Sequence, residues 1–338
     1  MNVAVLLLGY AALIAVLAPP LLARTHWAAR APRLGIWAWQ ALTATVVGSV
    51  VLAGLALAVP VLPVSGGLAE LLQACSLTLR QQYGTPGGGA VAASGTALAL
   101  AVLARVVWCL AAAVLRAWTE RRRHAAVLAV VGRAHAGLGV TVLEDARPAA
   151  YCLPGQGHRV VLTSGALAAL EPGELDAVIA HERAHIRQRH HLVLAYAEGL
   201  ERAFPRLSLF RTAAVETRRL VELAADDAAT ARTGSLSLAT ALVELAGAGG
   251  RPAGSSSAGS PAGPPASLAA SGGQVAGRVR RLLGGHRPLH RAVVWGGALA
   301  AGALLVLPLV VAAQPAMAST GTKSCPLPDA PVAAWGVW

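Results

Sequence analysis

The stretch from Ala90 to Arg123, AVAASGTALALAVLARVVWCLAAAVLRAWTERRR, changes character abruptly at Arg116. Up to Leu115 its only charged residue is Arg105. An apolar run of roughly 20 residues is long enough to cross the hydrocarbon core of a bilayer. We therefore expect a transmembrane helix over residues 90–115, with the arginines that follow it on the cytoplasmic side. Arg105 is expected to extend its side chain toward that side rather than to contact another helix.

Three further stretches are equally apolar: residues 3–23, 34–64 and 292–313. The 338 residues are 55% hydrophobic and only 13% charged, whereas about a quarter of the residues are charged in a typical soluble domain. This composition argues against an ordinary soluble enzyme and against a disordered chain. The sequence predicts a predominantly α membrane protein with four transmembrane helices, three of them within residues 1–116.

The arginines predict the orientation of these helices. They cluster between the first two spans, after the third span and before the fourth. By the positive-inside rule, the segment between spans 3 and 4 is cytoplasmic and both termini are extracytoplasmic. The net charge of +12 is then a topology signal and a contact with the lipid bilayer, and no direct nucleic-acid binding is expected. Lys323 is the only lysine, which indicates a high-GC bacterium.

The middle of the chain is polar, because 14 of the 16 acidic residues lie between Glu120 and Glu244. Residues 139–143, 149–153 and 159–163 are expected to form strands, the last two as a hairpin. A helix is expected to start near Pro172, with acidic residues in its first turn.

The His181-Glu182-Arg183-Ala184-His185 motif lies on this helix. Histidines at i and i+4 project from one helix face, so both imidazoles can bind one zinc ion (Zn2+), and Glu182 can take a proton from water. A hydrolytic zinc site needs a third ligand and one open position. On a second expected helix, Glu222 can be that ligand. Asp226, one turn later, can accept a hydrogen bond from a ligating histidine.

Other polar residues near these motifs have simpler interpretations. Asp227 points away from Asp226 on an ideal helix and is expected at the surface. His190 and His191 follow the end of the first helix, where they can interact with its free carbonyl groups. Arg218 and Arg219 are weak candidates for stabilising an oxyanion.

Four segments together resemble a family of integral-membrane zinc peptidases, the gluzincins. They are residues 151–155, 160–167, 174–185 and 222–226. The order of three spans, a zinc domain and a fourth span is similar to the M56 group, which includes the BlaR and MecR sensor proteases. The motifs are also similar to the related M48 group, which includes HtpX and the CAAX prenyl proteases.

The resemblance implies a zinc-dependent endopeptidase with one Zn2+ per chain. It implies His181, His185 and Glu222 as metal ligands and Glu182 as the base. The fold it implies is a cytosolic α+β zincin-like domain at residues 117–248, between spans 3 and 4. The segment after Ala313 is too short for the penicillin-binding domain of the BlaR type, so β-lactam sensing is not expected.

The remaining segments complete the expected organisation. Residues 249–277 are almost wholly Gly, Ala, Ser and Pro, which predicts a flexible linker. Residues 278–291 are expected to form a basic juxtamembrane segment, with Val279–Leu283 on the inner leaflet. A short extracytoplasmic tail is expected over residues 314–338. Cys75 and Cys325 would both lie on the oxidising side and could form a disulfide.

Two alternatives to a signalling protease that cleaves a transcriptional repressor stay open. One is an M48-type protease for membrane-protein quality control, and the other is a non-catalytic signal transducer with a structural zinc site. A protein or peptide substrate is expected to add as a strand beside Tyr151 and Leu153.

Overall fold

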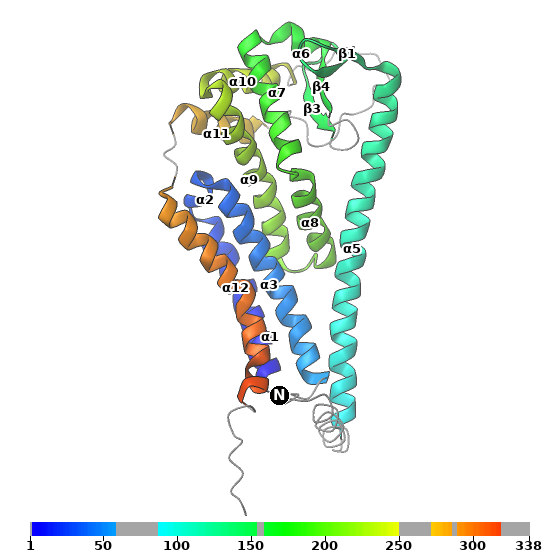
Figure 1. The fold of residues 1–338 in the computed structure, drawn as a ribbon, viewed down its shortest axis with the longest axis vertical. Helices are drawn as coiled ribbons and strands as arrows, with labels where there is room; N and C mark the ends of the chain where they lie inside the picture. The colour runs from blue at the N-terminus through cyan, green and yellow to red at the C-terminus, as the bar shows by residue number, and fades with distance from the viewer. Residues whose placement is uncertain (1, 59–86, 154–158, 250–271, 286–288, 319–338) are drawn as a thin grey trace, which may run out of the picture. The chain divides into compact units, whose positions relative to one another are not determined.

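The structure is a computed structural model that describes residues 2–58, 87–153, 159–249, 272–285 and 289–318 (Figure 1). Four of its helices are long and apolar enough to cross a membrane: α1 (Asn2–Ala23), α3 (Pro32–Ala58), α5 (Gly88–Val131) and α12 (Arg291–Ala318). A four-residue helix, α2 (Trp27–Arg30), precedes α3. These helices confirm the mostly helical fold with four candidate spans expected from the sequence, and they support a multi-pass membrane protein. The predicted Cys75–Cys325 pair lies outside the described residues.

Helix α5 is longer than the predicted span. It runs for 44 residues without a break at Arg116 and ends where the Gly132 amide donates to the Leu128 carbonyl at 2.9 Å. The change from apolar to basic residues is thus a change of composition and not of backbone, because both parts are rich in good helix formers. The side chain of Arg105 contacts another helix, which was not expected. Its Nε donates to the Ala203 carbonyl of another helix at 2.6 Å.

A four-stranded sheet follows α5, with the strand order β1-β2-β4-β3. Its strands are β1 (Arg133–His135), β2 (Val140–Leu143), β3 (Ala150–Leu153) and β4 (Arg159–Thr163). The predicted hairpin is confirmed, since β3 pairs antiparallel with β4 and Tyr151 lies opposite Val161. Strand β2 pairs with the other side of β4 in parallel. Strand β3 is therefore an edge of the sheet.

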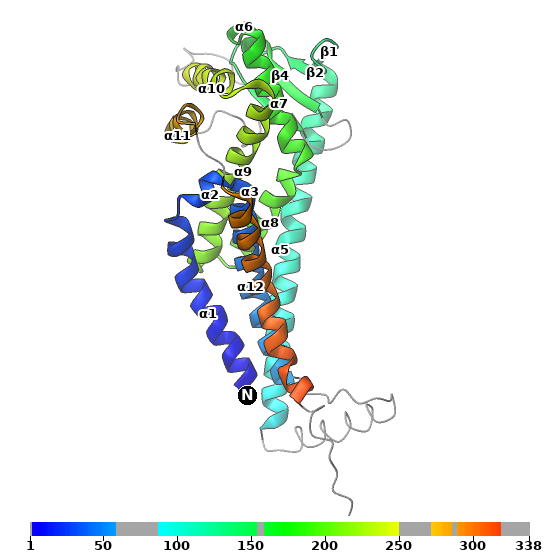
Figure 2. The same ribbon diagram turned by 60° about the vertical axis from the view of Figure 1, so that its left-hand side comes forward.

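Helices follow the sheet: α6 (Ser164–Ala169), α7 (Pro172–Arg187), α8 (His190–Ala203), α9 (Ser208–Thr233) and α10 (Ser235–Gly249). Helix α7 begins at Pro172 as predicted, and Glu171 and Glu174 form a capping box there. Helix α7 packs against β3 and β4 on one side and against α9 and α10 on the other (Figures 1 and 2). It is the central element of the core, and its buried side carries the two motif histidines.

The segment after residues 250–271 differs most from expectation. A helix, α11 (Gly272–Leu283), packs against α10 instead of forming the end of a linker and a juxtamembrane stretch (Figure 2). Val275 and Leu282 are buried in the same core as Leu238 and Leu242 of α10. The cause is helical spacing, because Val275, Val279 and Leu282 form one apolar stripe. Helix α11 is therefore part of the domain core.

Contacts divide the chain into two compact units. Among the described residues, one contains those within 2–9, 48–101 and 306–318, and the other contains those within 10–47 and 102–305. Within the second unit, α3 lies close to α9. A Cβ on Gly35 would lie 2.9 Å from Leu220 Cδ1, so the absence of a side chain there permits the contact. All the motif residues belong to this second unit.

Candidate metal centre

Helices α7 and α9 bring three potential metal ligands together. Ligand atoms of His181, His185 and Glu222 all lie within 4.8 Å of one another. The two histidine Nε2 atoms are 3.1 Å apart. Glu222 places Oε2 3.5 Å from His181 Nε2 and Oε1 3.7 Å from His185 Nε2. The three residues predicted as ligands therefore meet in one cluster.

The chemistry of this cluster fits a zinc ion. Zinc–ligand bonds of about 2.0–2.1 Å at a tetrahedral centre place the ligand atoms roughly 3.3 Å apart. The three separations in the cluster, 3.1, 3.5 and 3.7 Å, lie near that value. Two imidazoles and one carboxylate leave one position of a tetrahedron open. The cluster thus has the ligand types and the spacing of a hydrolytic zinc site.

Glu182 lies beside the cluster on α7 and is 3% exposed. Burial raises the pKa of its carboxyl to about 7, against the opposing positive charge of His181. Cys152 of β3 is close enough to hydrogen-bond with Glu182, and burial followed by the charge of Glu182 raises the pKa of its thiol well above the usual range. Glu182 is therefore placed and poised to accept a proton near neutral pH, next to a thiol that stays protonated.

One side of the cluster is held by charged groups. Asp226, which was expected to face a ligating histidine, is fully buried, and its Oδ1 lies 3.0 Å from Nδ1 of His181. Arg278 of α11 donates from Nε to Asp226 Oδ2 at 2.8 Å and from Nη2 to Oδ1 at 2.5 Å. Burial alone would raise the pKa of Asp226, but the hydrogen bonds from Arg278 and the nearby ring of His181 hold it well below the usual range. Asp226 is therefore an anion that orients the His181 ring.

The other side of the cluster is held by neutral groups. Nδ1 of His185 lies 3.1 Å from Nδ1 of His190, whose Nε2 lies 3.3 Å from Oε1 of Gln188. The same Gln188 oxygen accepts from Arg33 Nε at 3.2 Å. Because that oxygen can only accept, His190 carries its proton on Nε2 and accepts at Nδ1 from the Nδ1–H of His185. This tautomer leaves the Nε2 lone pair of His185 free for a metal.

A single backbone torsion brings His190 to this position. Arg189 has a φ of 51° and separates α7 from α8, so the chain turns there and His190 begins the next helix.

Both rings on this side of the cluster are neutral. Burial lowers the pKa of His185 to about 3 and that of His190 to about 4. His190 was expected to interact with helix carbonyls, whereas it contacts the predicted ligand His185.

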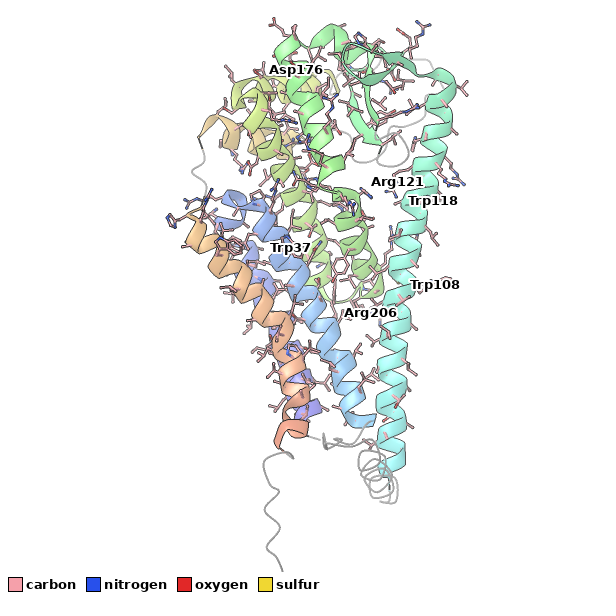
Figure 3. All side chains as sticks on the ribbon, in the orientation of Figure 1. Trp37, Trp108, Trp118, Arg121, Asp176 and Arg206 are labelled. Carbon is pink, nitrogen blue, oxygen red and sulfur yellow. The ribbon has the colours of Figure 1, made fainter. Side chains whose placement is uncertain are left out.

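A cavity of about 510 Å³ opens beside the cluster. Its walls come from α5, β3, α7 and α8, and Glu182 and His185 line it. Arg121, on the part of α5 that continues beyond the apolar segment, also lines it (Figure 3). The cavity is large enough to hold several side chains of a polypeptide next to the candidate metal ligands.

The predicted substrate strand borders the cavity. Tyr151 and Leu153 line it, but their side chains are mostly buried and pack in a cluster with Leu128 of α5. Cys152 points to the other side of β3, toward Glu182. The backbone edge of β3, more than these two side chains, is thus the part available to an extended peptide.

Several other sequence-based interpretations can be compared with the structure. Asp227 is partly exposed, but it forms an ion pair with Arg281 of α11 at 2.8 Å. Arg218 and Arg219 form exposed ion pairs with Glu201 and Glu216, and neither lines the cavity. Sequence reasoning did not single out Cys152, His190 or Arg278 as residues of the site. His190 had a weak signal in its short spacing from His185, and Arg278 had none.

Comparison with known proteins agrees with this geometry. No curated protein and no solved structure matches the chain. Residues 113–222 match Peptidase family M48, whose members depend on zinc. The match begins at Ala113 of α5 and ends at Glu222, so it contains all three candidate ligands and Glu182. The matched segment is therefore similar to metallopeptidases of that family, and the match supports a membrane-associated metalloprotease that acts on protein or peptide substrates.

Proposed function

We propose that the protein is a membrane-bound zinc endopeptidase in which His181, His185 and Glu222 hold the metal. The observation that carries the proposal is the cluster itself, with ligand atoms within 4.8 Å of one another and the buried Glu182 beside them. The cavity next to the cluster provides room for a substrate. The M48 match over the same residues supports the same activity.

The residues around the site have distinct tasks in this reaction. A bound zinc ion would polarise the peptide carbonyl and activate the attacking water. Glu182 takes the proton of that water and later delivers it to the leaving amine nitrogen. Its buried position beside the ligands suits both steps. Asp226 and His190 orient the two ligating imidazoles, and the edge of β3 holds the substrate backbone by strand addition.

Replacing Glu182 with Gln tests the enzymatic role. The expected result is retained zinc and proteolysis reduced by at least a hundredfold, because the amide cannot accept the proton. Glu216→Gln is the control, since Glu216 is also a glutamate of the same domain but pairs with Arg219 outside the cavity. Cellular output that is unchanged in the Glu182→Gln variant would instead support the non-catalytic transducer.

The biological role we propose is regulatory signalling of the M56 type, by cleavage of a repressor or another regulator. The order of spans and zinc motif supports it. The M48 match favours the alternative, a protease for membrane-protein quality control. Comparing cleaved protein termini between wild-type and Glu182→Gln cells separates the two. One or a few cleaved regulators support signalling, whereas many cleaved membrane proteins support quality control.

We also propose that the peptidase segment is cytoplasmic and that both termini are extracytoplasmic. The support is the arginine distribution, with arginines before α3 and along the later part of α5. Reporter domains that are active on only one side of the membrane, fused after residue 338 or inserted in residues 250–271, test this orientation. A C-terminal fusion that is active only in the cytoplasm would reverse it.

A further inference from the structure

Arg278 of α11 is a buried cation at the candidate metal centre. It is 4% exposed, although it lies on a helix outside the residues that match Peptidase family M48. Besides its two hydrogen bonds to Asp226, its Nη1 lies 3.0 Å from Glu222 Oε2. A single guanidinium therefore contacts both carboxylates that α9 directs toward the cluster.

The geometry of the contact depends on the shape of the guanidinium. Glu222 and Asp226 are one helical turn apart on α9, so their carboxylates lie one above the other. The planar fork of an arginine can bind one carboxylate through Nε and Nη2 while its remaining Nη1 reaches the other. The rounder ammonium of a lysine has no such fork. The site is thus built for arginine and not only for a positive charge.

These contacts reach two of the three candidate ligands. Arg278 holds Asp226, which lies 3.0 Å from His181 Nδ1. It also forms an ion pair with Oε2 of Glu222, the oxygen that faces His181 Nε2, so the guanidinium charge lies next to this carboxylate as well. Two carboxylates this close would repel each other if no cation lay between them.

We infer that Arg278 is a positioning residue of the metal centre, delivered to the site by helix α11. This inference rests on the proposed zinc peptidase. Arg278 fixes the carboxylate of Glu222 and, through Asp226, the ring of His181. The functional domain then extends beyond the M48 match to include α11, on the far side of the Gly- and Ser-rich residues 250–271.

A different role for Arg278 would be simply to dock α11. The chain offers a matched control for that role in Arg281, three residues later on the same helix. Arg281 Nη2 lies 2.8 Å from Asp227 Oδ1, and its Nε donates to the Ala29 carbonyl at 3.0 Å. Arg281 therefore ties α11 to α9 as Arg278 does, but it contacts neither Glu222 nor Asp226.

The experiment compares Arg278→Gln with Arg281→Gln in the full chain, solubilised in detergent. Zinc affinity is measured by competition with a chromophoric chelator, and the ligand field is measured from the visible absorption of the Co2+-substituted protein. We expect Arg278→Gln to raise the zinc Kd roughly 10- to 100-fold, the usual effect of losing a partner of a metal ligand. Its Co2+ spectrum should also change. Arg281→Gln should leave the Kd within about twofold and the spectrum unchanged.

Arg278→Lys keeps the inference testable if the Gln variant does not fold. Lysine retains the charge but loses the fork, so the Kd should lie between those of the wild type and the Gln variant, again with an altered spectrum. Wild-type Kd and spectrum in the Arg278 variants would overturn the inference, as would an equal loss in Arg281→Gln. Failure of the proposed function would appear instead in the wild type, as absent zinc binding or as proteolysis that survives Glu182→Gln.

Discussion

The two histidines of the motif are held in different ways. His181 is fully buried and backed by Asp226, an anion that is itself paired with Arg278. His185 is partly exposed and backed by the neutral ring of His190, then by Gln188 and finally by the exposed Arg33. One side of the centre is a closed charged network, and the other is a neutral chain of hydrogen bonds that ends at the surface.

This difference predicts different responses to substitution. Removing one partner of a buried ion pair leaves an uncompensated charge in a medium of low dielectric constant, which costs about 3–5 kcal/mol. Removing one partner of a neutral hydrogen bond costs about 1–3 kcal/mol when the other partner stays buried, and less when water can replace it. Removing any one residue of the charged side should therefore cause a large loss of stability and of zinc affinity. On the neutral side, the loss should depend on which residue is removed.

The largest effect is expected for Asp226→Asn. The amide is neutral and leaves the buried Arg278 without its full counter-charge, so the free energy of unfolding should fall by about 3–5 kcal/mol. Zinc affinity should fall about 100-fold, because His181 loses the anion that orients it. Denaturant unfolding of the metal-free protein and zinc competition measure the two effects.

The neighbouring Asp227→Asn is the control for this prediction. Asp227 also forms an ion pair with Arg281 of α11, but its side chain is 31% exposed, whereas that of Asp226 is not exposed, so the cost should be smaller, about 1–3 kcal/mol. Equal losses in the two variants would mean that the fully buried network and this partly exposed ion pair do not differ in their contribution to stability.

A smaller effect is expected for His190→Phe on the neutral side. Phenylalanine fills the space but cannot accept the hydrogen bond from His185 Nδ1–H. Zinc affinity should fall about 10-fold, and His190→Asn, which retains an acceptor, should recover part of it. If His190→Phe matched Asp226→Asn in both zinc affinity and stability, the two sides of the centre would not differ as their charges suggest.

Parts of the fold and site that depend on local spacing were predictable from the sequence. The apolar spans, the β3–β4 hairpin and the start of α7 at Pro172 follow from composition, alternation and capping within short windows. The sequence also led us to expect Asp226 near one of the two motif histidines, because Glu222 and Asp226, four residues apart, share a helix face. Each of these predictions needed no more than one or two elements of known periodicity.

The parts that escaped prediction depend on contacts between distant segments or on one torsion angle. Arg278 and Asp226 are 52 residues apart, and the composition of the Gly- and Ser-rich tract between them predicts a flexible linker. Composition gave no sign that a helix beyond that tract would return to the core. His190 reaches His185 because Arg189 adopts a left-handed conformation, which is uncommon for a residue with a side chain and has no signature in this sequence.

The smallest effects are expected farther along the neutral chain, at Gln188 and Arg33. Gln188→Ala removes the acceptor that fixes the His190 tautomer, but Gln188 is partly exposed and water can take its place, so the zinc Kd should rise no more than about threefold. Arg33→Ala removes an exposed donor and should leave the Kd unchanged within error. Zinc competition on His190→Phe, Gln188→Ala and Arg33→Ala in parallel would then show a loss that declines with distance from the ligand. A loss of the same size in all three variants would mean that the neutral chain acts as a single unit, as the charged side is expected to do.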